Sequence, residues 1–366
     1  MPHAIGDAVP EGIRILTICN ACRYCEGYCA VFPALERRTD LGAPDLHHLA
    51  NLCHNCAECY YACQYAPPHE FAVNVPKTLA EIRLSTYSAY AWPGSLRDLF
   101  RSGLTYRVPV LLTAIGVIIA AAIGLHPVAR GAGFYQVVSH GAMVAIFGTA
   151  SIIILLALFA GLVRFWKGTG PTPGSPTAAI ADALRSVLLL ENLSSHGSGC
   201  TYPAEHHSQS RRWFHHFTFY GFALCFASTS AAAFYHYVLG LNAPYAVSSL
   251  PVVLGALGGL GLLIGPVGLY RLKKRRNPMI VDTSQDTLDL IFLSLLFGTS
   301  LTGLVLLILR RSVFMPALLV VHLAIVLALF ASLPYGKFVH GLYRAAALWR
   351  DAMETRAARR KLPQSN

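Results

Sequence analysis

The sequence predicts a mainly α-helical membrane protein, with a cysteine-rich N-terminal domain followed by a bundle of six transmembrane helices. Three observations lead to this fold class. Eight of the ten cysteines lie between residues 19 and 63. Long segments without a charged residue follow residue 107. Strand-type alternation is scarce in the cysteine-rich part, where short helical patterns flank the cysteines. We expect three parts, namely residues 1–107, residues 108–345 and a basic cytoplasmic tail over 346–366.

The composition is that of a membrane protein. Apolar residues make up 54% of the 366 positions and charged residues 13%, against about 25% charged in soluble domains. This excludes a disordered chain, a basic nucleic-acid-binding domain and an ordinary soluble enzyme. Residues 1–18 contain no apolar run long enough for a signal peptide. The cysteine-rich part is therefore expected to stay in the reducing cytoplasm, where disulfides are rare.

The cysteine-rich domain is expected to be mostly helical. It is nearly neutral, with nine Lys/Arg and ten Asp/Glu in residues 1–107. Pro44 and Pro76 each stand in the first turn of a helical pattern, which is the position that proline prefers in a helix. Helices are therefore predicted to begin at these two prolines.

Two cysteine motifs with the same spacing, C-x2-C-x2-C-x3-C, dominate this domain. This spacing recurs in proteins with two 4Fe–4S clusters, in which the fourth cysteine of a run ligates the other cluster. We therefore expect one cluster on Cys19, Cys22, Cys25 and Cys63. The second cluster is expected on Cys53, Cys56, Cys59 and Cys29.

Structural zinc and disulfides are the alternatives for these cysteines. Zinc sites are usually built from separate CxxC pairs, which the duplicated runs fit poorly. In the common ferredoxin run a proline directly follows the fourth cysteine, whereas Pro33 and Pro67 come four residues after it. This departure favours a helical ferredoxin-like module. Of the two isolated cysteines, Cys225 is expected to pack within a helix, and Cys200 to serve docking or structure.

Six apolar segments are candidates for membrane-spanning helices, because a bilayer core requires about 20 apolar residues in a helix. They are residues 108–125, 134–163, two spans within 213–270, 290–309 and 312–335. With the N-terminal domain inside, the inner segments carry 17 Lys/Arg and the outer ones three. The positive-inside rule then places both termini in the cytoplasm. The net charge of +11 follows from this topology, and nucleic acid is not an expected partner.

Histidines in the spans are candidate haem ligands, since an ionisable residue at membrane depth is a functional hypothesis and histidine is a common axial ligand. The candidates are His215, His216 and His236 on the third span, and His322 and His340 on the sixth. His322 and His340 are 18 residues apart, five helical turns, and should share a face. We expect His236 to meet His322 near the outer surface, and His215 or His216 to meet His340 near the inner one. Each pair would hold one b-type haem. His140 is a further candidate ligand or quinone-site group.

Several longer motifs give the chain a resemblance to a known family. They are Ala30-Val31-Phe32-Pro33, Gln64-Tyr65-Ala66-Pro67-Pro68-His69-Glu70-Phe71, Tyr90-Ala91-Trp92-Pro93, Gly199-Cys200-Thr201-Tyr202-Pro203, Arg212-Trp213-Phe214-His215-His216 and Pro334-Tyr335-Gly336-Lys337-Phe338-Val339-His340. With the cysteine runs, they resemble the tricarballylate/citrate utilisation protein B family of membrane iron–sulfur proteins. The spans are also similar to those of the haem-bearing gamma subunit of respiratory nitrate reductase.

The resemblance implies a redox subunit in the inner (plasma) membrane. Its partner would be an FAD-dependent dehydrogenase of tricarballylate or a related tricarboxylate, whose reduced flavin it would reoxidise. Electrons would then reach the membrane quinone through the clusters and haem. A quinol-oxidising membrane subunit of a thiol/disulfide reductase is the alternative, with Cys200 or a partner's thiols as the terminus. A transporter or regulator with sensory clusters is disfavoured, because no charged residue besides histidine lies within the spans.

Overall fold

A computed structural model describes residues 8–95, 105–125, 133–194 and 200–361, and in these ranges the regular structure is helical. One antiparallel bridge joins Cys200 to Ser208. The helices are α1 (Ala8–Cys22), α2 (Val31–Glu36), α3 (Ala43–Leu52), α4 (Glu58–Tyr61), α5 (Val75–Tyr90), α7 (Thr105–Leu125), α8 (Phe134–Val137), α9 (His140–Gly168), α10 (Pro176–Leu189), α11 (Ser210–Tyr237), α12 (Leu250–Lys274), α13 (Asp286–Leu309), α14 (Met315–Ser332) and α15 (Val339–Lys361). The predicted mainly α-helical class is confirmed.

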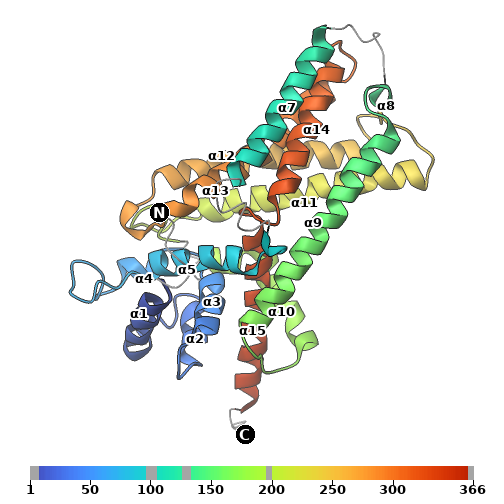
Figure 1. Ribbon diagram of the computed structural model, residues 1–366. Helices are drawn as coiled ribbons and strands as arrows, with labels where there is room; N and C mark the ends of the chain where they lie inside the picture. The colour runs from blue at the N-terminus through green and yellow to red at the C-terminus, as the bar shows by residue number, and fades with distance from the viewer. Residues whose placement is uncertain (1–7, 96–104, 126–132, 195–199, 362–366) are drawn as a thin grey trace.

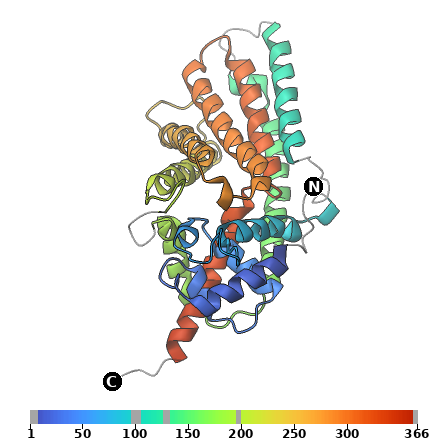
Figure 2. The ribbon, with the colours of Figure 1, turned by 90° about the vertical axis from the view of Figure 1, so that its left-hand side faces the viewer.

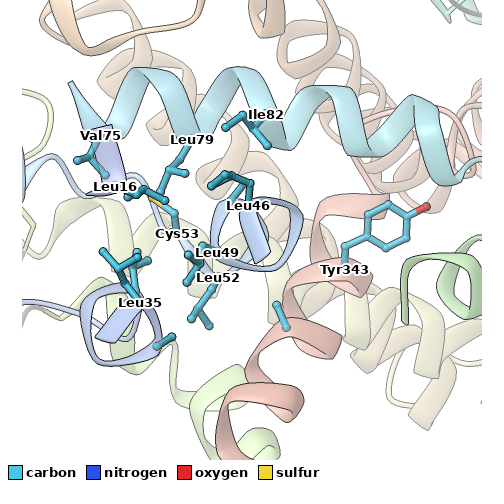
Figure 3. Packing of buried hydrophobic residues seen from close by; sticks show 14 of the residues in the cluster. Leu16, Leu35, Leu46, Leu49, Leu52, Cys53, Val75, Leu79, Ile82 and Tyr343 are labelled. Atoms are coloured by element: carbon cyan, nitrogen blue, oxygen red, sulfur yellow. The ribbon is translucent and has the colours of Figure 1, made fainter. Parts of the chain in front are cut away.

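The cysteine-rich domain is a small helical unit whose core lies between α1, α3 and α5 (Figure 3). Leu46 and Leu49 of α3 and Leu79 and Ile82 of α5 are 0–1% exposed. As predicted, helices begin at the two prolines: Pro44 lies in the first turn of α3 and Pro76 in the first turn of α5. Asn74 caps α5 by accepting a hydrogen bond from the amide of Lys77 at 3.2 Å, as capping side chains do.

The C-terminal helix α15 belongs to the same core. Tyr343 is 2% exposed and stacks on Phe165 of α9 with ring centroids 4.8 Å apart, and Ala347 is fully buried. Figures 1 and 2 show α15 running along the cysteine-rich domain. Up to residue 361, the segment predicted as a basic tail is therefore a packed helix. Residues 362–366 lie outside the described residues, as do residues 126–132 of the outer segment predicted near 126–133.

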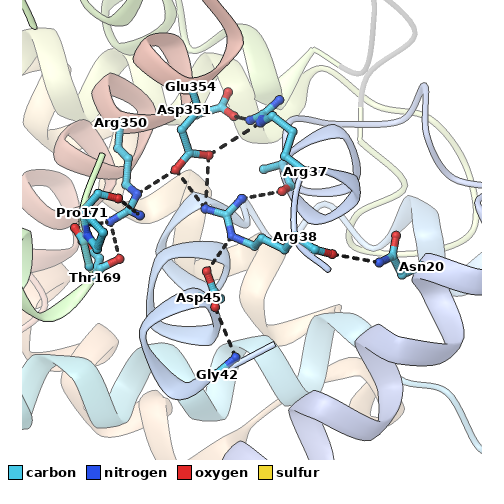
Figure 4. A network of polar contacts seen from close by, with 12 residues as sticks. Asn20, Arg37, Arg38, Gly42, Asp45, Thr169, Pro171, Arg350, Asp351 and Glu354 are labelled. Atoms are coloured by element: carbon cyan, nitrogen blue, oxygen red, sulfur yellow. Dashed lines mark hydrogen bonds and ion pairs between the residues drawn. The ribbon is translucent and has the colours of Figure 1, made fainter. Parts of the chain in front are cut away.

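A buried ion-pair network fastens α15 to the cysteine-rich domain (Figure 4). Glu354 accepts bonds from Arg38 at 3.0 and 3.1 Å and from Arg350 at 2.9 Å. Arg38 also bonds Asp45 of α3 at 2.9 Å, and Arg37 pairs with Asp351. The side chains of Arg38, Arg350 and Glu354 are only 6–8% exposed. Glu354 therefore pairs with both buried guanidinium groups, and Asp45 is a second carboxylate partner of Arg38.

Among the described residues, five helices are long and apolar enough to cross a membrane: His140–Gly168, Ser210–Tyr237, Leu250–Lys274, Thr283–Leu309 and Met315–Ser332. Their outward faces carry large apolar side chains, for example Phe159 at 67% and Ile308 at 77% exposure. A large apolar surface of this kind marks contact with lipid or a partner. The first predicted span coincides with α7.

The long helices pack in an order that differs from their order in the chain. In Figures 1 and 2, α7 lies beside α14. Helix α14 also contacts α13, α13 contacts α12, and α12 pairs with α11. The α11–α12 pair runs across the direction of α7 and α14 (Figure 1). Glycines allow α11 and α12 to touch closely, because a Cβ at Gly261 would lie 2.9 Å from the carbonyl oxygen of Phe217. Small residues permit such close approach in membrane helices.

The sixth predicted span is interrupted before His340. Helix α14 ends at Ser332, and α15 begins at Val339 after a turn in which the Gly336 amide bonds the Ser332 carbonyl at 2.7 Å. Pro334 lies in this turn, and proline cannot supply the amide that a continuing helix needs. His322 and His340 therefore lie on different helices, and the prediction that they share one helical face is wrong.

Replacing Glu354 by Gln should destabilise the protein, because the buried Arg350 loses its carboxylate and Arg38 keeps only Asp45. Breaking a buried pair costs about 3–5 kcal/mol, and the detergent-solubilised protein should melt at a clearly lower temperature. Glu191→Gln is the control, since its pair with Arg185 is exposed, at 37% and 73%, and exposed pairs contribute little. Equal melting temperatures for the two variants would contradict the role of the network.

Candidate metal centres

The first group of thiols surrounds a cavity next to α1. Cys19 and Cys22 stand on the last turn of α1, and Cys25 follows in the next turn. Together with Cys63 and Cys59 they line a cavity of about 230 Å³. The fourth cysteine of the second motif thus reaches the first three of the first motif. We call Cys19, Cys22, Cys25 and Cys63 the first thiol group.

The second group gathers where α3 ends. Cys53 follows the last residue of α3, and the loop to α4 turns sharply through Asn55 and Ala57, whose φ angles are 53° and 68°. Burial, then the neighbouring Cys56 and Cys53, raise the pKa of Cys29 well above its usual value. Cys29 therefore lies among the cysteines of the other motif. We call Cys29, Cys53, Cys56 and Cys59 the second thiol group.

Both groups are suited to metal binding rather than to free thiol chemistry. Burial and the neighbouring Cys63 raise the pKa of Cys19 to about 12, and burial likewise raises that of Cys25 to about 12. Such thiols are protonated at neutral pH unless a cation stabilises the thiolate. Among the described residues, no three metal-binding side chains are placed to hold a single ion. Four cysteines in each group match the number of ligands of a 4Fe–4S cluster.

Cys200 is buried against the second thiol group. Its side chain is 0% exposed, its thiol donates to the Leu193 carbonyl at 3.2 Å, and it packs with Cys56. The neighbouring Thr201 hydroxyl donates to the Cys56 carbonyl at 3.3 Å. The loop of Cys200, predicted to serve docking or structure, therefore packs against the segment that carries Cys56 of the second thiol group.

A second cavity, of about 150 Å³, lies between the second thiol group and the long helices. The 53–57 loop, α5, the start of α11, the ends of α12 and α13 nearest the cysteine-rich domain, and the start of α15 surround it. Its polar lining includes His54, Asn55, Arg83, Arg211, His215, Lys273, Arg276, Gln285, Asp289, Lys337, His340 and Arg344. Basic side chains outnumber acidic ones here. Sequence reasoning missed this cavity, because its lining comes from segments far apart in the chain.

His215 and His340 face each other in this cavity, with ring centroids 6.1 Å apart. Metal–imidazole bonds are about 2 Å long, and two such bonds plus the two ring radii span about 6 Å. His340 donates from Nδ1 to the Lys337 carbonyl at 2.5 Å, a bond that typically orients a ligating histidine. Burial beside Lys337 and Arg344 lowers the pKa of His340, so the ring is neutral. Nδ1 of His215 is buried without a partner.

His216 points elsewhere, so the structure distinguishes between the two adjacent histidines. Its ring stacks on Tyr220 with centroids 5.6 Å apart and lies 6.1 Å from Trp213. Successive residues on a helix point about 100° apart, and only His215 is directed toward α15. Of the two alternatives, the structure brings His215 to His340.

The expected pair of His236 and His322 is not formed. His236 stacks on His140 of α9 with centroids 4.3 Å apart, whereas His322 bonds the Thr302 hydroxyl of α13 at 3.0 Å. The reason is the packing of the helices. The far end of α11 reaches the start of α9, while α14 turns His322 toward α13. Histidine spacing along the chain does not reveal these contacts.

Two crossed groups of four thiols in a helical domain, joined to long apolar helices, define a membrane protein of the iron–sulfur class. Two family models match the chain: "Citrate utilization protein B" over residues 97–361 and "Citrate utilization protein B Fer4-like domain" over residues 12–89. Citrate utilization protein B of Escherichia coli is 47% identical over 350 residues, covering 94% of this chain and 92% of that protein. The chain belongs to the citrate utilization protein B family. No solved structure matches it.

These matches confirm the family resemblance predicted from the sequence motifs. The Fer4-like match covers both cysteine runs and supports the iron–sulfur interpretation of the N-terminal domain. The other match extends to the end of α15, in line with the packing of that helix into the domain.

Proposed function

We propose that this protein carries electrons from a partner FAD-dependent dehydrogenase of tricarballylate, or a related tricarboxylate, to the membrane quinone pool. The family match supports an electron-transfer role in citrate or tricarboxylate utilisation. One observation carries the route: the loop of the second thiol group and the His215–His340 pair border the same cavity. Redox groups held at these two places would be neighbours.

In this proposal each thiol group holds one 4Fe–4S cluster, which supplies one-electron transfer when bound. Cys19, Cys22, Cys25 and Cys63 would ligate one cluster, and Cys29, Cys53, Cys56 and Cys59 the other. The first thiol group is the more accessible, since Tyr24 beside it is 65% exposed. Cys53 and Cys56 of the second group are 8% exposed. A reduced flavin would therefore approach the first group.

His215 and His340 are the proposed axial ligands of a b-type haem, which adds a further one-electron carrier when bound. Their centroid separation of 6.1 Å and the fixed Nδ1 of His340 suit ligation by both rings. His236 and His322 do not form a second site of this kind, so the proposal includes one haem. His216 remains outside the ligand set.

The proposed setting is the inner (plasma) membrane, with six spans and the iron–sulfur domain in the cytoplasm. Helix α7 is 21 residues long, which suffices for a sixth span at about 1.5 Å per residue. The division of Lys/Arg, 17 against three, supports this sidedness. The thiol/disulfide alternative is weakened, because Cys200 is buried and bonded to Leu193.

Replacing cluster ligands should sort the cysteines into two sets. The purified protein should contain about eight cluster irons. Cys25→Ser and Cys63→Ser should perturb the same electron paramagnetic resonance signal, while Cys29→Ser perturbs the other. Cys225→Ser is the matched control, because Cys225 lies in α11 outside both groups. Should Cys63→Ser instead perturb the signal that Cys29→Ser perturbs, the crossed ligation is wrong.

His215→Ala and His340→Ala should each remove the b-type α-band of the dithionite-reduced protein, because one imidazole cannot hold the haem from both sides. His216→Ala should retain the band, since that ring faces Trp213 and Tyr220. Reduced-minus-oxidised absorption spectra measure the outcome. Loss of the band only in His216→Ala would refute the ligand assignment, and its absence from the wild-type protein would remove haem from the route.

Membrane vesicles that contain this protein and the flavoprotein should reduce an added ubiquinone analogue when tricarballylate is supplied. Cys29→Ser should abolish this reduction, because the second thiol group lies on the route, and Cys225→Ser should not. Absorbance of the quinone measures the rate. Vesicles that instead oxidise a quinol and reduce a partner disulfide would favour the thiol/disulfide alternative.

A further inference from the structure

Three arginines from three different helices converge on the loop of the second thiol group. Arg83 of α5 donates to the Cys53 carbonyl at 2.8 Å, and Arg344 of α15 donates to the same oxygen at 2.6 Å. Arg211 of α11 donates to the Asn55 carbonyl at 2.7 Å. These guanidinium groups therefore surround residues 53–55. This segment begins at the proposed ligand Cys53 and ends just before the proposed ligand Cys56.

The three guanidinium groups have no carboxylate partner among the described residues. Other basic side chains of the cavity do, for Lys273 and Lys337 share Asp289 and Arg276 pairs with Asp286. Arg83 is only 5% exposed, and Arg211 and Arg344 are half-buried. Buried charge without a counter-charge is costly, so an anionic group at the second thiol group would stabilise it.

The first thiol group has a different electrostatic environment. Arg23 is the only basic residue between positions 19 and 29; it is exposed, and it donates to the Asn20 carbonyl at 3.2 Å. One thiol group is thus surrounded by positive charge and the other is not.

We propose that Arg83, Arg211 and Arg344 raise the reduction potential of the cluster on the second thiol group above that of the cluster on the first. The inference rests on the proposed function, because it requires both clusters. Reduction adds negative charge, and nearby positive charge stabilises the reduced form most where solvent is excluded. Electrons then move from the exposed first group to the buried second group and on toward His215 and His340.

The transfer is a simple one-electron step. One electron would pass from a cluster held by the first thiol group to a cluster held by the second thiol group. No bond is formed or broken and no proton moves. The reductant is the reduced flavin of the partner, and the next acceptor lies at the His215–His340 pair. The arginines thereby give the protein a direction of electron flow.

Arg344→Gln and Arg211→Gln should each shift the midpoint potential of the second cluster to a more negative value and leave that of the first unchanged. Redox titration monitored by electron paramagnetic resonance measures both midpoints without any turnover. The signals are assigned beforehand with Cys63→Ser for the first cluster and Cys29→Ser for the second. Glutamine retains a side-chain donor for the loop carbonyls, so the main change is the loss of charge.

Two controls separate charge from structure. Arg344→Lys retains the positive charge. Its midpoint for the second cluster should therefore stay much closer to the wild-type value than that of Arg344→Gln. Arg14→Gln, on the exposed face of α1 where the arginine pairs with Glu11, should change neither midpoint. Unchanged midpoints in both glutamine variants, or equal shifts in Arg344→Lys and Arg344→Gln, would overturn the inference. A wild-type protein with fewer than two clusters would instead refute the proposed function.

Discussion

The packing of α15 into the cysteine-rich domain is the contact on which the candidate site depends. Its buried face carries Tyr343 and Ala347 into the core, and Glu354 binds Arg38 and Arg350 in the network of Figure 4. This network fixes the position of α15 along its own axis relative to the cysteine-rich domain. The first turns of the same helix then present His340 and Arg344 to the cavity. A shift of α15 by one turn, about 5.4 Å, would remove both from the loop of the second thiol group.

The second constraint is electrostatic. The cavity brings several basic side chains together that are buried or half-buried. Hydrogen bonds to backbone carbonyls stabilise three of them only in part. Such bonds orient a guanidinium group without neutralising it. An anionic cluster on the adjacent thiols would therefore stabilise the arginines, and the arginines would stabilise its reduced form. In the proposed holoprotein, folding and redox properties would be linked through the same three side chains.

The long helices contribute in a different way. Close contact between α11 and α12 at Gly261 fixes the start of α11, where Arg211 and His215 lie. Ion pairs of Lys273 and Lys337 with Asp289 join α12, α13 and the turn before α15. The membrane-facing part therefore determines which side chains reach the cavity, while the cysteine-rich domain supplies the loop that they surround.

The sequence alone determined the helical class, the two thiol groups and the apolar spans. Cysteine spacing limits which thiols can reach one cluster, and a bilayer imposes a length of apolar residues, so both features can be recognised locally. The histidine pairs and the arginines around residues 53–55 were decided by the tertiary structure. The turn at Pro334 separates His322 from His340, and the crossing of α11 directs His236 to His140. Contacts between helices depend on packing angles and side-chain volumes, which residue spacing along one chain does not specify.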